Sequence, residues 1–177
     1  STTMPDHSGL SNNGQLYGYT EPLSNWIGEG FRGDALLFAG GQAIHQSVTV
    51  TQPVNYTIAF WFKSGQQPYW SAFYSEKQVS PPPGGYGLGT QFSIRLDNSL
   101  LKIEAKERDY NRLFFVSKDM SAYLDGETWH HLAFVADGEA ANAAVYLDGQ
   151  FFAGSDYKKS SHKTTGLNAS VGYSWAD

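Results

Sequence analysis

Two neighbouring stretches decide the fold of this chain: WHHLAFVAD at residues 129–137 and AAVYLDGQFF at residues 143–152. In both, apolar residues recur at every second position, which is the side-chain period of a β-strand. The first stretch has apolar residues on both faces, as expected of a central strand that is buried on two sides. The second contains Asp148-Gly149 between apolar residues, the strongest short signal for a β-hairpin. Together they predict a run of antiparallel strands.

The same alternation extends along the rest of the chain. Residues 56–63 and 92–96 carry alternating apolar side chains, and the Asp-Gly pair at 125–126 marks a second tight turn. Residues 118–123 form the one segment expected to adopt a helical turn. This pattern predicts an all-β domain, a two-sheet antiparallel jelly-roll sandwich of about ten or eleven short strands. Further strands are expected near residues 14–19, 35–38, 43–50, 69–75, 100–106, 112–117 and 167–173.

Composition narrows the class of protein. The 177 residues contain 12 Lys and Arg against 17 Asp and Glu, for a net charge of −5. An acidic chain without a basic run is poorly suited to bind nucleic acid or anionic membranes, and no apolar stretch is long enough to insert across a membrane. The absence of cysteine excludes disulfides and a cysteine nucleophile. The length suits one domain, residues 1–177, with residues 78–90 as a long exposed Pro/Gly-rich loop.

The sequence lacks the carboxylate pattern of a glycoside hydrolase. Such enzymes need two carboxylates that flank one glycosidic bond. The nearest candidates are Glu104 and Glu107 with Asp109, but a strand points the two glutamates to opposite faces. We expect them to be solvated charges at a strand end. His130 and His131 are adjacent, so we expect one packed and one half-exposed histidine rather than a metal-binding pair. The sequence therefore predicts that the chain is not an enzyme.

Aromatic residues outside the core alternation indicate a ligand-binding site. A sugar ring stacks its C–H face on a flat aromatic ring, while amide and charged side chains bind its hydroxyl groups. The alternative is that each ring covers the rim of the core. Trp61 and Trp129 differ from this set because they lie within predicted strands, and we expect them to be packing residues. The candidate ligand-binding residues are Tyr69, Trp70, Tyr86, Tyr110 and Asn111.

Three segments carry a family resemblance: residues 6–14 (DHSGLSNNG), residues 33–40 (GDALLFAG) with 56–63 (YTIAFWFK), and residues 129–135 with 145–150. In this order they resemble the laminin-G-like domains of the concanavalin A-like lectin/glucanase superfamily. The resemblance implies a jelly roll of two curved antiparallel sheets. It does not imply one function, because such folds host lectins, enzymes, adhesins and receptors.

The resemblance also implies a strand before residue 6 and another after Gly172. Only five residues lie on the outer side of each position, so we expect the domain to lack its terminal strands. The first and last segments are then expected to lie close together. A strand from a neighbouring subunit or from the parent polypeptide is expected to complete the exposed sheet edge. The alternative is a variant whose residues 1–5 and 173–177 already pair.

Structural calcium is the one cofactor that the resemblance implies. Domains of this family often carry a calcium ion held by loop oxygen atoms, and calcium takes about six to eight oxygen ligands. Asp6, Asn12 and Asn13 offer such atoms in a glycine-punctuated loop. The alternative is an Asx-turn, in which the same side chains only shape the loop.

These observations favour a non-catalytic ligand-binding module, carbohydrate-binding or adhesive, on an extracellular, cell-surface or virion protein. Its expected partner is a glycan or another cell-surface ligand, with no nucleic acid and no membrane insertion. The alternative from a different class is a structural or assembly subunit of a filament, phage particle or surface layer. Glycan binding by the monomer distinguishes the first hypothesis from the second, which expects polymers.

Overall fold

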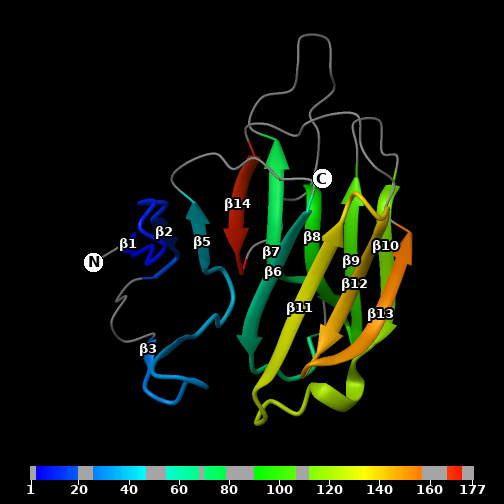
Figure 1. Cartoon of the computed structure of the whole chain (residues 1–177). Coiled ribbons are helices and arrows are strands. Elements are labelled where there is room, and N and C mark those ends of the chain that lie inside the picture. The colour runs from blue at the N-terminus through cyan, green and yellow to red at the C-terminus, as the bar shows by residue number, and fades with distance from the viewer. Residues whose placement is uncertain are drawn as a thin grey trace.

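The computed structural model describes residues 3–19, 26–46, 55–67, 70–78, 90–106, 112–156 and 167–172. In this part of the chain the strands form two antiparallel sheets, with a two-stranded ribbon beside them (Figure 1). The larger sheet has the order β1 (Thr3–Met4), β2 (Gly14–Tyr17), β5 (Ala43–Gln46), β14 (Leu167–Val171), β7 (Ser71–Gln78), β8 (Thr90–Asp97), β9 (Leu100–Lys106) and β10 (Arg112–Asp119). The smaller sheet has the order β13 (Gln150–Asp156), β12 (Asn142–Leu147), β11 (His130–Asp137) and β6 (Asn55–Phe62). The ribbon pairs β3 (Trp26–Ile27) with β4 (Ala35–Leu36).

The predicted all-β sandwich is confirmed. Among the described residues the only helical element is a 3₁₀ turn at Ser121–Tyr123, inside the segment predicted to turn. The same part of the chain contains no helix with the length and apolarity needed to cross a membrane. The strands outnumber the prediction because two-residue strands such as β1 and β3 are too short to show any periodicity.

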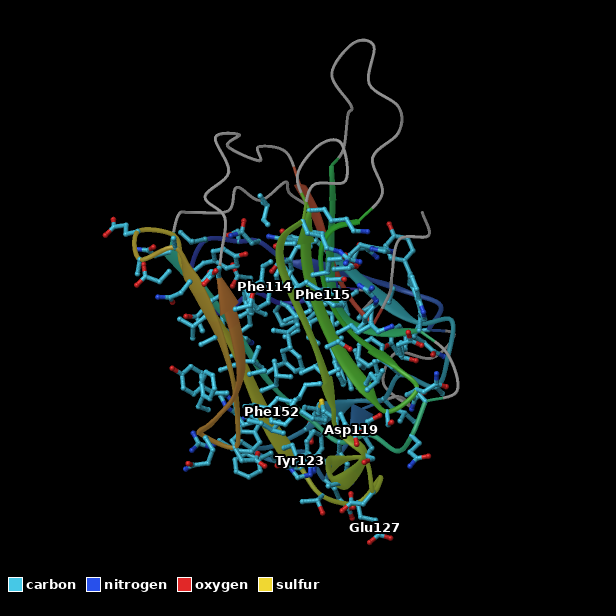
Figure 2. The ribbon with its side chains drawn as sticks, turned by 90° about the vertical axis from the view of Figure 1, so that its right-hand side faces the viewer. Phe114, Phe115, Asp119, Tyr123, Glu127 and Phe152 are labelled. Carbon is cyan, nitrogen blue, oxygen red and sulfur yellow. The ribbon has the colours of Figure 1, made fainter. Side chains whose placement is uncertain are left out.

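The core lies between the two sheets, and Figure 2 shows the side chains that fill this space. Ile94 of β8 and Ile103 of β9 are register partners, and both are fully buried. Phe134 of β11 belongs to the same core cluster. Its ring centroid lies 5.1 Å from that of Phe92 and 5.3 Å from that of Phe114. Each such buried side chain contributes about 1.5–3 kcal/mol, so this aromatic cluster holds the two sheets together.

The carboxylate of Asp148 links the Asp148-Gly149 turn to the adjacent histidines His130 and His131. Asp148 and Gly149 both have positive φ, at 50° and 78°, as a tight hairpin requires. The Asp148 carboxylate accepts a hydrogen bond from the His131 backbone N–H at 2.8 Å and lies 2.7 Å from Nδ1 of His130. Burial alone would raise the pKa of Asp148, but the hydrogen bonds from His131 and His130 outweigh it and lower the pKa. The turn is thereby tied to the start of β11.

Strand β11 is central in its sheet, as predicted, but only one of its faces is buried. His130 points inward and is buried, whereas His131 is half-buried on the outer face, which confirms the prediction for the histidine pair. The same alternation puts Trp61 and Trp129 on the outer face, so the expectation of two-sided burial is wrong. Only one sheet packs against this strand, because the four-stranded sheet is an outer layer of the sandwich.

The sandwich closes where β10 meets β13. The ring of Tyr123, in the 3₁₀ turn after β10, lies edge-on to Phe152 of β13 with a centroid distance of 5.9 Å (Figure 2).

At the opposite edge of the large sheet, β1 pairs with β2, so a short strand does precede Asp6. Strand β14 lies between β5 and β7 in the same sheet. Residues 173–177 lie outside the described part of the chain, and strand completion by a neighbour stays a prediction.

Candidate functional site

The outer face of the large sheet carries an unusual number of charged side chains. Alternation along β8 and β9 turns Ile94 and Ile103 into the core, so Arg95 and Glu104 point to the other side. The pairing register places Ser93 beside Glu104 and Arg95 beside Lys102. We call this surface the charged face. It consists of Ser93, Arg95, Asp97, Lys102, Glu104, Lys106, Arg112 and Phe115, together with Trp70.

Glu104 is the centre of the charged face. Its carboxylate accepts a hydrogen bond from Nε of Arg112 at 2.6 Å, and it forms ion pairs with Lys106 at 3.3 Å and Arg95 at 3.4 Å. The side chain is only 5% exposed, so the expectation of a solvated charge at a strand end is wrong. Burial would raise the pKa of this carboxyl, but the Arg112 hydrogen bond and the charges of Lys106 and Arg95 outweigh it. Its pKa is lowered, and Glu104 is ionised at neutral pH.

Arg95 connects Glu104 to the exposed Trp70. Its Nη1 donates to the hydroxyl of Ser93 and its Nη2 to Glu104, while its buried Nε has no hydrogen-bond partner among the described residues. The guanidinium carbon lies 4.6 Å from the centroid of the Trp70 ring, a cation–π distance. The Trp70 side chain is 57% exposed. An indole ring held in this way presents a flat apolar surface, whereas Ser93, Arg95 and Glu104 beside it are buried.

Cations outnumber carboxylates on the charged face. Among the described outward residues of β8, β9 and β10, four cationic side chains accompany three carboxylates: Lys102 pairs with Asp97, the other three cations surround Glu104, and Asp119 binds Ser121 at the end of β10. The described residues around Glu104 are therefore locally positive on a chain whose net charge is −5.

Trp70 also lines a groove of about 1120 Å³ that runs between segment 30–42 and strands β6 and β7. The other large rings of this groove are already engaged. Phe31 stacks on Trp61 with ring centroids 3.5 Å apart, and Nε1 of Trp129 donates to the Glu29 carbonyl at 3.2 Å. Trp61 and Trp129 are therefore packing residues, as predicted. They pack outside the core, where they hold segment 28–34 against the sheet.

Residues 38–177 match the family Laminin_G_3, described as the concanavalin A-like lectin/glucanases superfamily. The chain belongs to this superfamily. Among curated proteins, none matches the chain in sequence.

Solved structures show how widely this superfamily's fold is used. A botulinum neurotoxin serotype D binding domain superposes with a TM-score of 0.65 at 12% identity, over 95% of this chain and 40% of that one. Endo-β-1,4-glucuronan lyase from Trichoderma reesei gives 0.57 at 13% identity, over 96% and 81%. The CBM40 of a Ruminococcus gnavus sialidase, bound to α2,3-sialyllactose, gives 0.51 at 17% identity, over 67% and 63%. At these identities the likeness shows the fold alone, in binding domains and in an enzyme.

Of the predicted ligand-binding residues, Trp70 is described and lies on the charged face of this lectin-like domain. Tyr69, Tyr86, Tyr110 and Asn111 lie outside the described residues. Trp70 immediately precedes β7, whereas Tyr86 falls in the segment that follows it. The eight residues of β7 span about 25 Å. The end of β7 from which the Tyr86 segment departs is therefore far from Trp70.

Sequence analysis missed the residues around Glu104 as a group. The sequence does predict a polar outer face here, because the polar residues of β8 and β9 alternate with apolar ones. The convergence of Arg95, Lys106 and Arg112 on one carboxylate depends on pairing between β8, β9 and β10. No local pattern shows which charges become neighbours across strands.

The predicted calcium ligands lie together in one loop. The Asp6 carboxylate accepts hydrogen bonds from the backbone N–H and hydroxyl of Ser8, at 2.7 and 2.6 Å, and from the Asn12 N–H at 2.8 Å. The Ser8 hydrogen bonds, followed by that of Asn12, lower the pKa of Asp6. Asn13 Oδ1 accepts from the Asp6 N–H. These are the hydrogen bonds of the Asx-turn alternative. Within the described ranges no group of three or more acidic or histidine side chains could hold a metal ion, and calcium stays a prediction.

Proposed function

We propose that this domain is a non-catalytic glycan-binding module whose site is formed by Trp70 and the charged face. The observation that carries the proposal is the exposed Trp70 ring, held against Arg95 where it lines the groove. An exposed indole stacks on the C–H face of a sugar, and the exposed guanidinium of Arg112 on the same face offers donors to its oxygen atoms. Binding domains with the same fold, one of them bound to sialyllactose, support this role.

The carboxylates of the charged face favour binding over hydrolysis. A glycosidase needs one carboxyl that is protonated near neutral pH and a second that faces it across the bond. Glu104 is held ionised by three cations, and Asp97 is paired with Lys102. The Trichoderma lyase shows that the fold also accommodates an enzyme. Incubation with the bound glycan is therefore part of the test, and no cleavage is expected.

The same proposal includes the setting of the module. Glycans are presented on cell surfaces, in extracellular matrices and on virions, and we place the parent protein in one of these locations. Surface labelling of intact cells or particles with an antibody against this domain tests the location, and staining only after permeabilisation would exclude it.

Glycan-array screening followed by calorimetry tests the function. We expect Trp70→Ala to weaken binding to any array hit by about 1–3 kcal/mol, as the loss of an aromatic anchor does. Phe151→Ala is the matched control, because Phe151 is 66% exposed and lies on the outer face of the other sheet. Its affinity should equal that of the wild type. An array without hits, or unchanged affinity in Trp70→Ala, contradicts the proposal.

One surface favours the assembly-subunit alternative. The outer face of the four-stranded sheet exposes Phe151, and Trp61 at its edge is 41% exposed. Half-buried apolar residues lie between them on β11 and β12, among them Val135 and Tyr146. Exposed apolar patches are typical of contacts between proteins. Sedimentation velocity at increasing concentration tests this alternative: polymers that disappear in Phe151→Ser support it, and a monomer at all concentrations excludes it.

A further inference from the structure

We infer that the ligand of this module is an acidic glycan, and that Arg112 and Lys106 on the charged face bind its sugar carboxylate. This inference rests on the proposed function and adds the chemical class of the ligand. Uronic acids and sialic acids both supply the required group, a carboxylate attached to a sugar ring.

The charge around Glu104 is the first reason. Three cations surround one carboxylate within 3.4 Å, so like charges lie close together with incomplete compensation. Cations that gather around one carboxylate repel one another. A second carboxylate, supplied by a ligand, compensates this excess. A neutral sugar does not. The locally positive face also attracts an acidic glycan, even though the chain as a whole is acidic.

The exposure and contacts of Arg112 are the second reason. Its side chain is 60% exposed, although its Nε is fixed by Glu104 at 2.6 Å and its guanidinium carbon lies 4.4 Å from the centroid of the Phe115 ring. The guanidinium group is therefore held at its Nε edge by Glu104 and on one face by the Phe115 ring. Its terminal nitrogens make no hydrogen bond to the described residues. A guanidinium presents two parallel donors to a carboxylate, which favours this pairing over a hydroxyl group.

The position of Trp70 is the third reason. Arg95 of β8 stacks against Trp70 and also contacts Glu104, the carboxylate that Arg112 of β10 holds from the other side. Two strand spacings, about 10 Å, separate β8 from β10, and Arg112 also lies further along the sheet, because it is opposite Lys106 whereas Arg95 is opposite Lys102. This separation exceeds the width of one sugar ring. A glycan stacked on Trp70 therefore reaches Arg112 with a neighbouring residue, and the ligand is an oligosaccharide rather than a single sugar.

Calorimetry with matched pairs of glycans tests the inference. One pair is a glucuronate tetramer and the same tetramer with its carboxyls reduced to hydroxymethyl groups. The other pair is α2,3-sialyllactose and lactose, which separates a sialic acid source from a uronic acid source. We expect the wild type to bind at least one acidic member about tenfold more tightly than its neutral partner. The preference should shrink at high salt.

Variants that each remove one positive charge test whether Arg112 is the residue that binds the sugar carboxylate. Arg112→Gln should reduce affinity for the acidic glycan by about tenfold and leave the neutral partner unaffected, with Arg112→Lys between the two. Lys118→Gln is the control, because it removes the same charge from the same strand at a site beside Phe152; it should change neither affinity. Arg112→Gln is expected to lower the melting temperature, because Glu104 loses its 2.6 Å hydrogen bond; a single cooperative unfolding transition above the assay temperature in every variant confirms the fold.

Equal binding of acidic and neutral partners, or a preference that survives Arg112→Gln, overturns the inference. If neutral glycans then still bind in a Trp70-dependent manner, the proposed function stands without it. If no glycan of either class binds, both fail.

Discussion

On the outer face of the large sheet, charged side chains line three neighbouring strands and converge on Glu104. On the outer face of the four-stranded sheet, the equivalent positions hold Trp61, Ala133, Tyr146 and Phe151. Both faces arise from the same alternation of inward and outward side chains. They differ in what contacts their aromatic rings: Phe31 stacks on Trp61, which stays 41% exposed, whereas the guanidinium of Arg95 lies against Trp70, which is 57% exposed. An exposed aromatic ring outside the core is therefore a stronger ligand candidate when charged groups, rather than other aromatic rings, lie beside it.

Replacing Glu104, the centre of the charged face, should lower the free energy of unfolding more than any other substitution considered. Glu104→Gln leaves Arg95, Lys106 and Arg112 without their shared carboxylate, and breaking a buried ion pair from one side costs about 3–5 kcal/mol. We expect the free energy of unfolding in urea to fall by about 3 kcal/mol. Glu127→Gln is the control, because Glu127 is exposed at the end of the molecule away from this network (Figure 2). Equal stability of the two variants would show that the network around Glu104 contributes nothing.

Replacing Trp61 and Trp70 separately by alanine distinguishes a packing tryptophan from a ligand-binding one. Trp61→Ala should lower the free energy of unfolding by about 1–2 kcal/mol, because it removes an aromatic stack and its buried area, and glycan affinity should be unchanged. Trp70→Ala should lower glycan affinity while changing stability less. Urea denaturation and calorimetry on both variants measure the two effects. A loss of affinity in Trp61→Ala with none in Trp70→Ala would move the binding site to the groove wall at Phe31.

Acidification should weaken the charged face at Glu104 and the β12–β13 turn at Asp148, because the pKa values of both carboxylates are lowered in the folded state. The ordinary values are 4.5 for Glu104 and 3.8 for Asp148. As the pH falls below them, the unfolded chain takes up protons first, so the free energy of unfolding decreases with acidification. The stability gap between wild type and Glu104→Gln should therefore narrow below about pH 4.5. A gap that stays constant from neutral to acidic pH contradicts the lowered pKa of Glu104.

The smallest expected effect concerns the Asp6 loop. If calcium binds there, a chelator lowers the melting temperature by mass action, and Asp6→Ala abolishes that difference. The calcium prediction fails if the chelator leaves the melting curve unmoved. Asp6→Ala should still lower the melting temperature slightly in that case, because Ser8 and Asn12 lose the acceptor that shapes the loop.

Local sequence pattern was sufficient for the elements of the sandwich. Period-two alternation identified β6, β8, β11 and β12, and Asp148-Gly149 identified the hairpin, because both signals depend on residues adjacent in the chain. The opposite orientation of His130 and His131 followed from the same period. Element ends were predicted less closely, since β7 begins at Ser71 rather than near residue 69.

The sequence by itself determined an all-β sandwich of alternating strands, but it predicted burial of β11 on both faces, where the structure buries one. Only the tertiary structure decided which outward residues meet. Glu104 gained its three cations through the register of β8, β9 and β10, and Trp61 gained a stacking partner in Phe31, thirty positions away in the chain. The physical reason is that side-chain period is a local property of the backbone. Strand register and the packing of distant segments are set by the free energy of the whole core, which no single stretch of sequence contains.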